Sequence, residues 1–418
     1  MAEPGLIVKL YDLQTNELAD ISGICLGRQI SVRKNLPRGL TLEVPAQHEL
    51  LTATADDGFR NLQKGDRKII AWESDRDDEP IFHGRIWRAR RVGNGRTNRV
   101  TINAYDPQIE FGAQSGNAGR YVRDDTGNFI RPSFGDTITG ADFLYQALVN
   151  SQQTGSESDP TPGEGPLPID IGDGSRFSST VNLSMDNLMS WPMLLGDAVA
   201  KLVATGVLDI DMRPIDPTEG LDPYAMCAVS AGDSIGTDRS GTVHFDYWTG
   251  SHNAKEATLD EDFATILNKL YDFLGTPLPE FNGTRWKDNI TPGTAGTLID
   301  PTDSRSRYGV FMLMRFLDYL RPTHTDPLAL ALWNAEMGYR IFPRDLLYVT
   351  PRPGTKALFR PFGRDYDAGD IIAVNVGEAL GVPDLSTDQR VLGYDVVWSR
   401  NNVARVSQLV TSADVSVA

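Results

Sequence analysis

Residues 62–107, LQKGDRKIIAWESDRDDEPIFHGRIWRARRVGNGRTNRVTINAYDP, decide the fold of this chain. A Gly-Asp pair precedes a first apolar run, an acidic loop follows, and a glycine leads into a second run that carries Trp87. After a Gly-Asn-Gly turn, a third run begins with Arg-Val and ends at Asp106. Short runs rich in β-branched and aromatic residues, separated by turn residues, predict three strands of an antiparallel meander.

The same order of elements recurs near the end of the chain, at residues 369–414. A Gly-Asp pair again precedes an apolar run, and Gly393 opens a run that carries Trp398. An Asn-Asn turn follows, and an Arg-Val run leads to Asp414. Because the order is shared although the identity is low, we predict an internal duplication of one β-meander.

The composition is typical of a globular chain with more than one domain. At 418 residues the chain exceeds one ordinary core, and 40% of its residues are apolar and 23% charged. The net charge of −16 disfavours nonspecific binding to nucleic acid or anionic lipid. Cys25 and Cys227 are too few for a disulfide framework, so we expect buried or indifferent thiols. No stretch approaches about 18 uninterrupted apolar residues, so we expect no membrane span.

Further strands are expected before the first meander, at residues 6–11, 28–32 and 40–44. Together with the meander they give residues 1–112 at least six strands and no convincing helix. A closed antiparallel barrel is the simplest arrangement, because closure removes exposed strand edges.

These segments resemble the first domain of tail hub proteins of long-tailed bacteriophages. The resemblance lies in PRGLTLEV at residues 37–44, the Gly-Asp strand, FHGRI at residues 82–86 and VTINAYDP at residues 100–107. The family is called baseplate hub (gp27-like) or, in phages of actinobacteria, minor tail protein. The resemblance implies a mainly β chain with inserted α+β segments and two antiparallel barrels of the tail-tube kind. Three such chains would present six barrels to a hexameric tube.

The resemblance also implies partners and a place in the virion. The chain would form a homotrimer at the tail tip, with the tail tube or distal tail protein above and tip, spike or receptor-binding proteins below. The tape measure protein would lie in the lumen, and genomic DNA would meet the chain only in transit. We expect a structural protein with no enzymatic activity, no cofactor and no metal.

The chain is expected to fall into five segments. These are a first tube-like barrel (1–112), an inserted helical and loop region (113–206), the start of a second barrel with its helix (207–275), a peripheral insertion (276–345) and the completion of the second barrel (346–418). Apolar residues at helical spacing predict helices at residues 141–151, 188–206, 260–274 and 328–338. Alternation predicts a strand at residues 207–214, and the resemblance to the hub family implies that this strand enters the second barrel.

Candidate sites are few, and each has a simpler structural interpretation. No metalloprotease, nucleophile-elbow, P-loop or dinucleotide motif is present. Asp209 and Asp211 share one face of a strand and would suit a glycosidase, but a polar outer face is simpler. The acidic loop from Asp75 to Glu79 lacks calcium-ligand spacing and is better explained as a solvated hairpin tip.

Aromatic and basic residues of the two meanders are the candidate interface. The tryptophans would stack on sugar or pack at a core or subunit contact, and we favour packing. The arginines between residues 85 and 99 are the one basic concentration, and on an acidic chain we favour pairing with acids across a subunit contact. The interface residues that we predict are Trp87, Arg88, Arg90, Trp398 and Arg400. Two alternatives stay open: a tail-associated cell-wall hydrolase, and a tail protein that binds carbohydrate on the host surface.

Overall fold

The computed structural model describes most of the chain. The described residues are 5–12, 16–48, 67–76, 79–93, 98–112, 120–123, 138–152, 167–180, 182–183, 193–204, 208–216, 225–247, 253–263, 266–274, 302–317, 344–352, 359–381, 387–399, 401 and 404–412.

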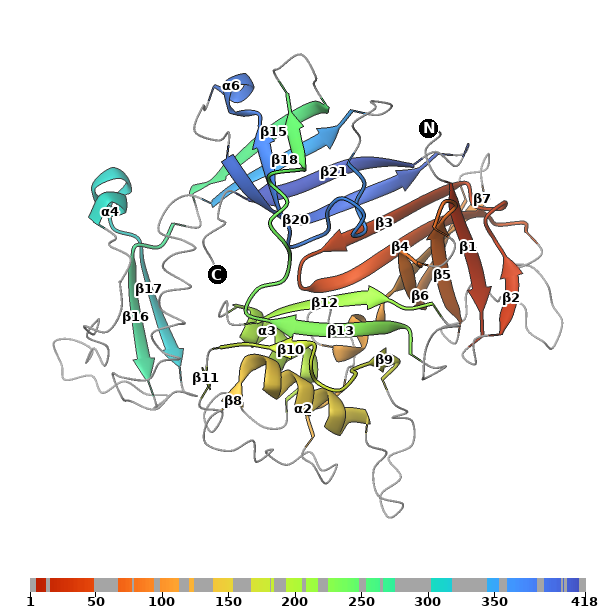
Figure 1. The fold of residues 1–418 in the computed structure, drawn as a ribbon, viewed down its shortest axis with the longest axis horizontal. Helices are drawn as coiled ribbons and strands as arrows, with labels where there is room; N and C mark the ends of the chain where they lie inside the picture. The colour runs from red at the N-terminus through yellow and green to blue at the C-terminus, as the bar shows by residue number, and fades with distance from the viewer. Residues whose placement is uncertain are drawn as a thin grey trace.

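One large sheet dominates the described residues and contains 13 strands (Figure 1). Its first half contains β1 (Leu6–Tyr11), β2 (Glu17–Asp20), β3 (Gly27–Arg33), β4 (Leu36–Pro45), β5 (Lys68–Glu73), β6 (Phe82–Gly93) and β7 (Asn98–Tyr105). Its second half contains β14 (His244–Asp246), β15 (Ala254–Asp262), β18 (Arg344–Pro351), β19 (Ile371–Asn375), β20 (Thr387–Trp398) and β21 (Ala404–Ser412).

The two halves have the same strand order. The first half runs β3-β4-β7-β6-β5-β1, and the second runs β15-β18-β21-β20-β19-β14. The pairs are antiparallel in both halves except β14–β19, which is parallel where β1–β5 is antiparallel. Both long strands also carry a β-bulge at the same place, with Trp87 the extra residue in β6 and Leu392 the extra residue in β20. The duplication predicted from the sequence is confirmed.

The halves are continuous because the C-terminal part of β20 pairs with β3. This antiparallel pairing runs from Gly393 opposite Arg33 to Trp398 opposite Arg28. The order of the described strands ends at β2 on one side and at β15 on the other, so the sheet is open. The mainly β fold class is confirmed, whereas closure of each half into its own barrel stays a prediction.

A shared hydrophobic core holds the halves together. Alternate residues of β3, β4, β18 and β20 point into it, including Ile30, Leu40, Leu347 and Val396, each no more than 2% exposed. Burial of an aliphatic side chain contributes about 1.5–3 kcal/mol. Strands from opposite ends of the chain therefore depend on one another for their burial.

A smaller unit with its own core occupies the lower part of Figure 1. It contains η2 (Pro107–Phe111), β8 (Ile138–Thr139), α2 (Gly140–Gln152), β9 (Ile169–Asp170), β10 (Phe177–Ser178), β11 (Asn182–Leu183), α3 (Leu195–Ala204), β12 (Asp209–Pro214) and β13 (Cys227–Gly232). Strands β12 and β13 form its main hairpin, and β9 and β10 pair with β13 in parallel. The helix predicted at residues 141–151 is confirmed as α2. The next predicted helix, at residues 188–206, is confirmed from Leu195 as α3, whereas Leu194 forms a β-bridge with Tyr121.

The strand at residues 209–214 lies in this smaller unit, not in the large sheet. β12 pairs only with β13 among the described strands, and its alternate residues Ile210 and Met212 are buried in the smaller core. The expectation that this strand enters a second barrel is therefore wrong. The second half of the large sheet begins later in the chain, at β14.

The helix predicted at residues 260–274 is also wrong. The segment forms the end of β15 and then β16 (Lys269–Leu274), which pairs in parallel with β17 (Met312–Leu317). The apolar residues of KLYDFL have helical spacing, but the segment pairs with the apolar β17 and is therefore extended. Two short helices complete the described elements: α4 (Thr302–Tyr308) and α6 (Gly377–Leu380). The helix predicted at residues 328–338 lies outside the described residues.

Candidate functional site at the junction of three segments

The turn between β3 and β4 attaches the large sheet to the smaller unit. Asn35 has a left-handed backbone (φ 62°), a conformation that asparagine tolerates better than most residues. Its side-chain amide donates to Asp209 Oδ1 at 2.8 Å, and its Oδ1 accepts the backbone N–H of Ile210 at 2.8 Å. Lys34 Nζ lies 2.7 Å from Asp209 Oδ2. The turn therefore contacts β12 through hydrogen bonds of Asn35 and an ion pair of Lys34.

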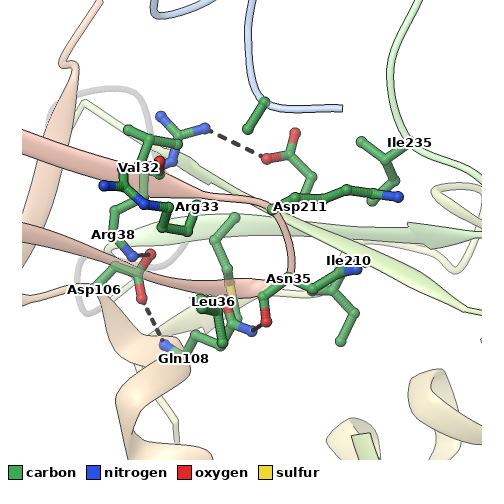
Figure 2. A pocket seen from close by; sticks show the side chains of 13 residues that line it. Val32, Arg33, Asn35, Leu36, Arg38, Asp106, Gln108, Ile210, Asp211 and Ile235 are labelled. Atoms are coloured by element: carbon green, nitrogen blue, oxygen red, sulfur yellow. Dashed lines mark hydrogen bonds and ion pairs between the residues drawn. The ribbon is translucent and has the colours of Figure 1, made fainter. Parts of the chain in front are cut away.

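Arg38 joins three parts of the chain at one point. Its guanidinium Nη2 lies 3.4 Å from Asp211 Oδ1 of β12 and 3.4 Å from Asp367 Oδ2, which precedes β19. Figure 2 shows Arg38 and Asp211 on the wall of a small polar pocket that also exposes atoms of Asp106. Arg38 is only 6% exposed, so its charge depends on these carboxylates for compensation. We call Lys34, Asn35, Arg38, Asp106, Asp209, Asp211 and Asp367 the Arg38 junction.

Asp106 fixes the backbone on either side of the junction by accepting two hydrogen bonds. Its Oδ2 accepts the backbone N–H of Arg38 at 2.8 Å, and its Oδ1 accepts that of Gln108 at 3.0 Å, which caps η2. Burial raises the pKa of Asp106 to about 7, against the two backbone donors, which lower it. Burial lowers the pKa of Arg38, but Asp367, Tyr394 and Asp211 raise it by more than burial lowers it. The pKa is therefore above its ordinary value, and the guanidinium stays charged.

Asp367 connects the junction to the second half of the sheet. Tyr394 of β20 donates its phenolic O–H to Asp367 Oδ1 at 2.7 Å, and its oxygen accepts the backbone N–H of Phe362 at 3.1 Å. Burial raises the pKa of Tyr394 well above its ordinary value, so the phenol remains a neutral donor. The series of polar contacts from Asp211 through Arg38 and Asp367 to Tyr394 thus links the smaller unit with the first and second halves of the large sheet.

A second set of ion pairs links the first hairpin to the segment before β19. Asp75 Oδ2 lies 2.8 Å from Arg360 Nη1, and Asp75 Oδ1 lies 2.8 Å from Arg364 Nη2. Burial raises the pKa of Asp75, but the hydrogen bonds and charges of Arg364 and Arg360 together lower it below its ordinary value. The acidic loop expected to be a solvated tip therefore includes one carboxylate that binds the second half of the chain.

His83 of β6 lies where the large sheet meets the smaller unit. Its side chain is 1% exposed, and its Nδ1 lies 3.0 Å from the carbonyl oxygen of Ile215. Burial lowers the pKa of His83 to about 3, so the imidazole is neutral and donates to that carbonyl. The adjacent Cys227 is buried, as is Cys25, and both are free thiols, as expected.

The predicted interface residues separate into two environments. Trp87 is 40% exposed, and Arg88 and Arg90 on the same strand are also exposed. Trp398 is 1% exposed and stacks on Phe362 with ring centroids 6.3 Å apart. It pairs with Ala404 beside the β20–β21 turn, whereas Trp87 sits in the bulge near β5, so the two tryptophans are not equivalent. Arg400 lies outside the described residues.

The described residues offer no assembled catalytic centre. Asp209 and Asp211 are engaged by Lys34, Arg38 and Arg213, the last at 2.8 Å from Asp211. Within the described ranges no cluster of three metal-ligating side chains occurs. None of the described helices is long and apolar enough to cross a membrane. The arrangement is suited to holding segments of the chain in fixed orientation.

The Arg38 junction was not found from the sequence. Its partners come from β4, β12 and the segment before β19, and no local spacing relates them. The only local signals were Asn35 and Gly39 in the β3–β4 region and the alternation of acids in β12.

Comparisons with known proteins agree on the fold. A prophage tail protein, gp18, from Listeria monocytogenes EGD-e matches with a TM-score of 0.52 and 12% identity over 99% of this chain and 95% of its own. A 43 kDa tail protein of prophage MuSo2 from Shewanella oneidensis matches with a TM-score of 0.51 and 9% identity over 97% of this chain and 98% of its own. No family model matches the sequence. No curated protein matches it either.

The fold is thus that of bacteriophage tail proteins, and the resemblance drawn from the sequence is confirmed at the level of the fold. The similarity extends along nearly the whole chain, and at such low identity it concerns the fold alone.

Proposed function

We propose that this protein is a structural component of a bacteriophage tail, the hub at its distal tip. It forms a homotrimer that adapts the hexameric tube to threefold tip proteins and lines part of the channel through which DNA leaves. In this role it acts without catalysis, cofactor or metal. Its neighbours are the tube or distal tail protein above, tip, spike or receptor-binding proteins below, and the tape measure protein inside.

The observation that carries this proposal is the shared strand order of the two halves. A chain with two equivalent halves gives three copies six equivalent units, which matches a sixfold tube with a threefold assembly. The smaller unit is present once per chain and would mark the threefold positions. The net charge of −16 lets DNA pass without adhering. From the domain scheme, the proposal retains residues 1–112 and 346–418 as parts of two tube-like units, but the strand at residues 209–214 belongs to the smaller unit.

The test is the mass and position of the chain in assembled particles. Light scattering of the purified chain is expected to give three times the 46.0 kDa mass of one chain. Labelled chain imaged in particles should appear once per tail, at the end distal to the capsid. A stable monomer within assembled tails, or label along the whole tube, would contradict the proposal.

A cell-wall hydrolase remains the second candidate, because Asp209 and Asp211 lie on one strand. Zymography on peptidoglycan with Asp211→Asn as the comparison tests it. Since both carboxylates already bind cations of the Arg38 junction, we expect no clearing by either protein. A sugar-binding role would predict binding of the purified chain to host cells and loss of that binding in Trp87→Ala.

A further inference from the structure

Two edges of the large sheet have no partner strand in the described part of the chain. β6 pairs with β5 only from Phe82 to Arg85, although β6 continues alongside β7 to Gly93. β15 pairs with β18 along one edge, and no described strand lies on its other edge. An exposed edge presents unpaired N–H and C=O groups and is a template for another strand.

The duplication identifies what each edge is missing. β6 corresponds to β20, and β15 corresponds to β3, by their places in the two strand orders. In the second half, the edge of β20 beyond β19 is occupied by β3. The equivalent edge of β6 therefore lacks a β3-like strand, and β15 is such a strand without its β20-like partner.

The pairing also fixes the register on β6. Arg85 is opposite both Lys68 and Tyr105, just as Arg390 is opposite both Ile371 and Ser412. The bulges follow two positions later in each strand. Counting from these anchors places Arg90 where β20 has Asp395.

The register on β15 follows in the same way. Ser31 of β3 is opposite Gly39, and Asp260 of β15 is opposite Leu346. Gly39 and Leu346 are in turn opposite the equivalent ends of β7 and β21. Asp260 therefore stands where β3 has Ser31, the residue that faces Asp395 inside the chain.

We propose that β15 of one copy pairs antiparallel with β6 of the next copy, with Arg90 opposite Asp260. Arg88 and Arg90 are exposed on β6, and Glu256, Asp260 and Glu261 are exposed on β15. At the junction within one chain, Arg33 of β3 forms an ion pair of 3.0 Å with Asp395 of β20. Within the chain the arginine lies on β3 and the acid on β20, whereas between copies the arginine lies on the β20-like strand β6 and the acid on the β3-like strand β15. The charges are complementary in both joints, although their placement is reversed.

This contact is head-to-tail, because different edges meet. Such contacts form rings when the rotation closes and filaments when it does not. The inference rests on the proposed function only for the number of copies in the closed ring, which is three. The strand pair itself rests on the topology and on charge.

Disulfide trapping in the full chain tests the register. An Arg90→Cys chain is mixed with an Asp260→Cys chain under mild oxidation and run on a non-reducing gel. Directly opposed residues have Cβ atoms about 4.5–5.5 Å apart, close enough for a disulfide after a small adjustment. The native Cys25 and Cys227 are buried, so background is expected to be low. A linked dimer should form in the mixture and not in either chain alone.

Two controls frame the result. Thr258→Cys mixed with Arg90→Cys, two residues out of register, should link at least tenfold more slowly. Ser31→Cys with Asp395→Cys in one chain occupies the equivalent internal pair and should close an internal disulfide.

The outcomes separate this inference from the proposed function. If the internal control closes and light scattering shows a trimer, but Arg90→Cys and Asp260→Cys do not link, the strand pair is wrong and the hub proposal stands. If the chain stays monomeric at every concentration and nothing links between copies, both are wrong.

Discussion

Arg38 shows how one buried charge can hold distant segments. Removal of the guanidinium takes away the cation that lies 3.4 Å from Asp367 and leaves Asp211 with only the exposed Arg213 as its cationic neighbour among the described residues. The energy at stake is that of an unpaired buried charge, which exceeds the worth of the pair itself.

Arg38→Met is therefore expected to lower the free energy of unfolding by about 3–5 kcal/mol. Arg213→Met is the matched control, because Arg213 binds the same Asp211 with a side chain that is 75% exposed. A change of at most about 1 kcal/mol is expected there. Denaturant titration followed by tryptophan fluorescence measures both, and equal losses would refute a special role for Arg38.

His83 gives the chain a defined dependence on acid. Its pKa of about 3 in the fold lies below the ordinary value of 6.5, so the unfolded chain takes up a proton before the folded one. Stability is fully present above about pH 6.5 and falls as pH decreases toward 3, by at most about 1.4 kcal/mol per pH unit. His83→Asn should flatten this slope while costing stability at pH 7. Unfolding midpoints between pH 4 and pH 7 decide, and an unchanged slope would mean that His83 does not titrate this way.

At the scale of elements, β6 and β20 show that equivalent strands can have different surroundings. β20 has strands on both edges along its length, whereas β6 has one free edge in the described residues. Trp398 is buried and Trp87 is exposed because they occupy different places in the two hairpins, Trp398 beside the β20–β21 turn and Trp87 in the bulge of β6.

Trp398→Ala should cost about 3–5 kcal/mol, because it leaves a large cavity beside Phe362. Trp87→Ala should change the stability of the isolated chain by less than about 1 kcal/mol. It should instead weaken self-association, since Trp87 adjoins the free edge of β6. Thermal unfolding and sedimentation of the two variants, measured together, distinguish the two roles, and the reverse pattern would contradict them.

Much of the element order was predictable, because strands here carry their own signals. The apolar runs of β5 and β19 and the glycine-led runs of β6 and β20 are bounded by turn residues, so local pattern sufficed. The prediction for residues 260–274 was wrong because their apolar residues have helical spacing, whereas the strand partner β17 that makes the segment extended is distant in sequence. The unit to which β12 belongs could not be predicted, because no local pattern shows in which of the two cores Ile210 and Met212 are buried.

For the whole molecule, the proposed joint between copies is electrostatic. β6 presents arginines and β15 presents acids, so salt should weaken association by screening. The expected result is dissociation of the oligomer between about 0.1 M and 1 M salt, where the Debye length falls from about 10 Å to about 3 Å. Analytical ultracentrifugation at fixed protein concentration measures it.

Charge exchange provides the matched variants. Arg90→Glu and Asp260→Lys should each prevent association, and the double variant should restore it because the pair is again opposite in sign. Restoration identifies the two residues as partners; failure of the double variant, with both single variants folded, would contradict the strand pair.

The continuity of β3 with β20 has a consequence for assembly. One of the two kinds of joint is made inside the chain when it folds, at an effective concentration that the polypeptide itself sets. The other requires collision of separate copies and obeys mass action. Half of the contacts in a closed ring would thus be independent of how much protein a cell makes, and expression level would govern only the rest. A phage that needs few copies of such a component would thereby complete rings at low abundance.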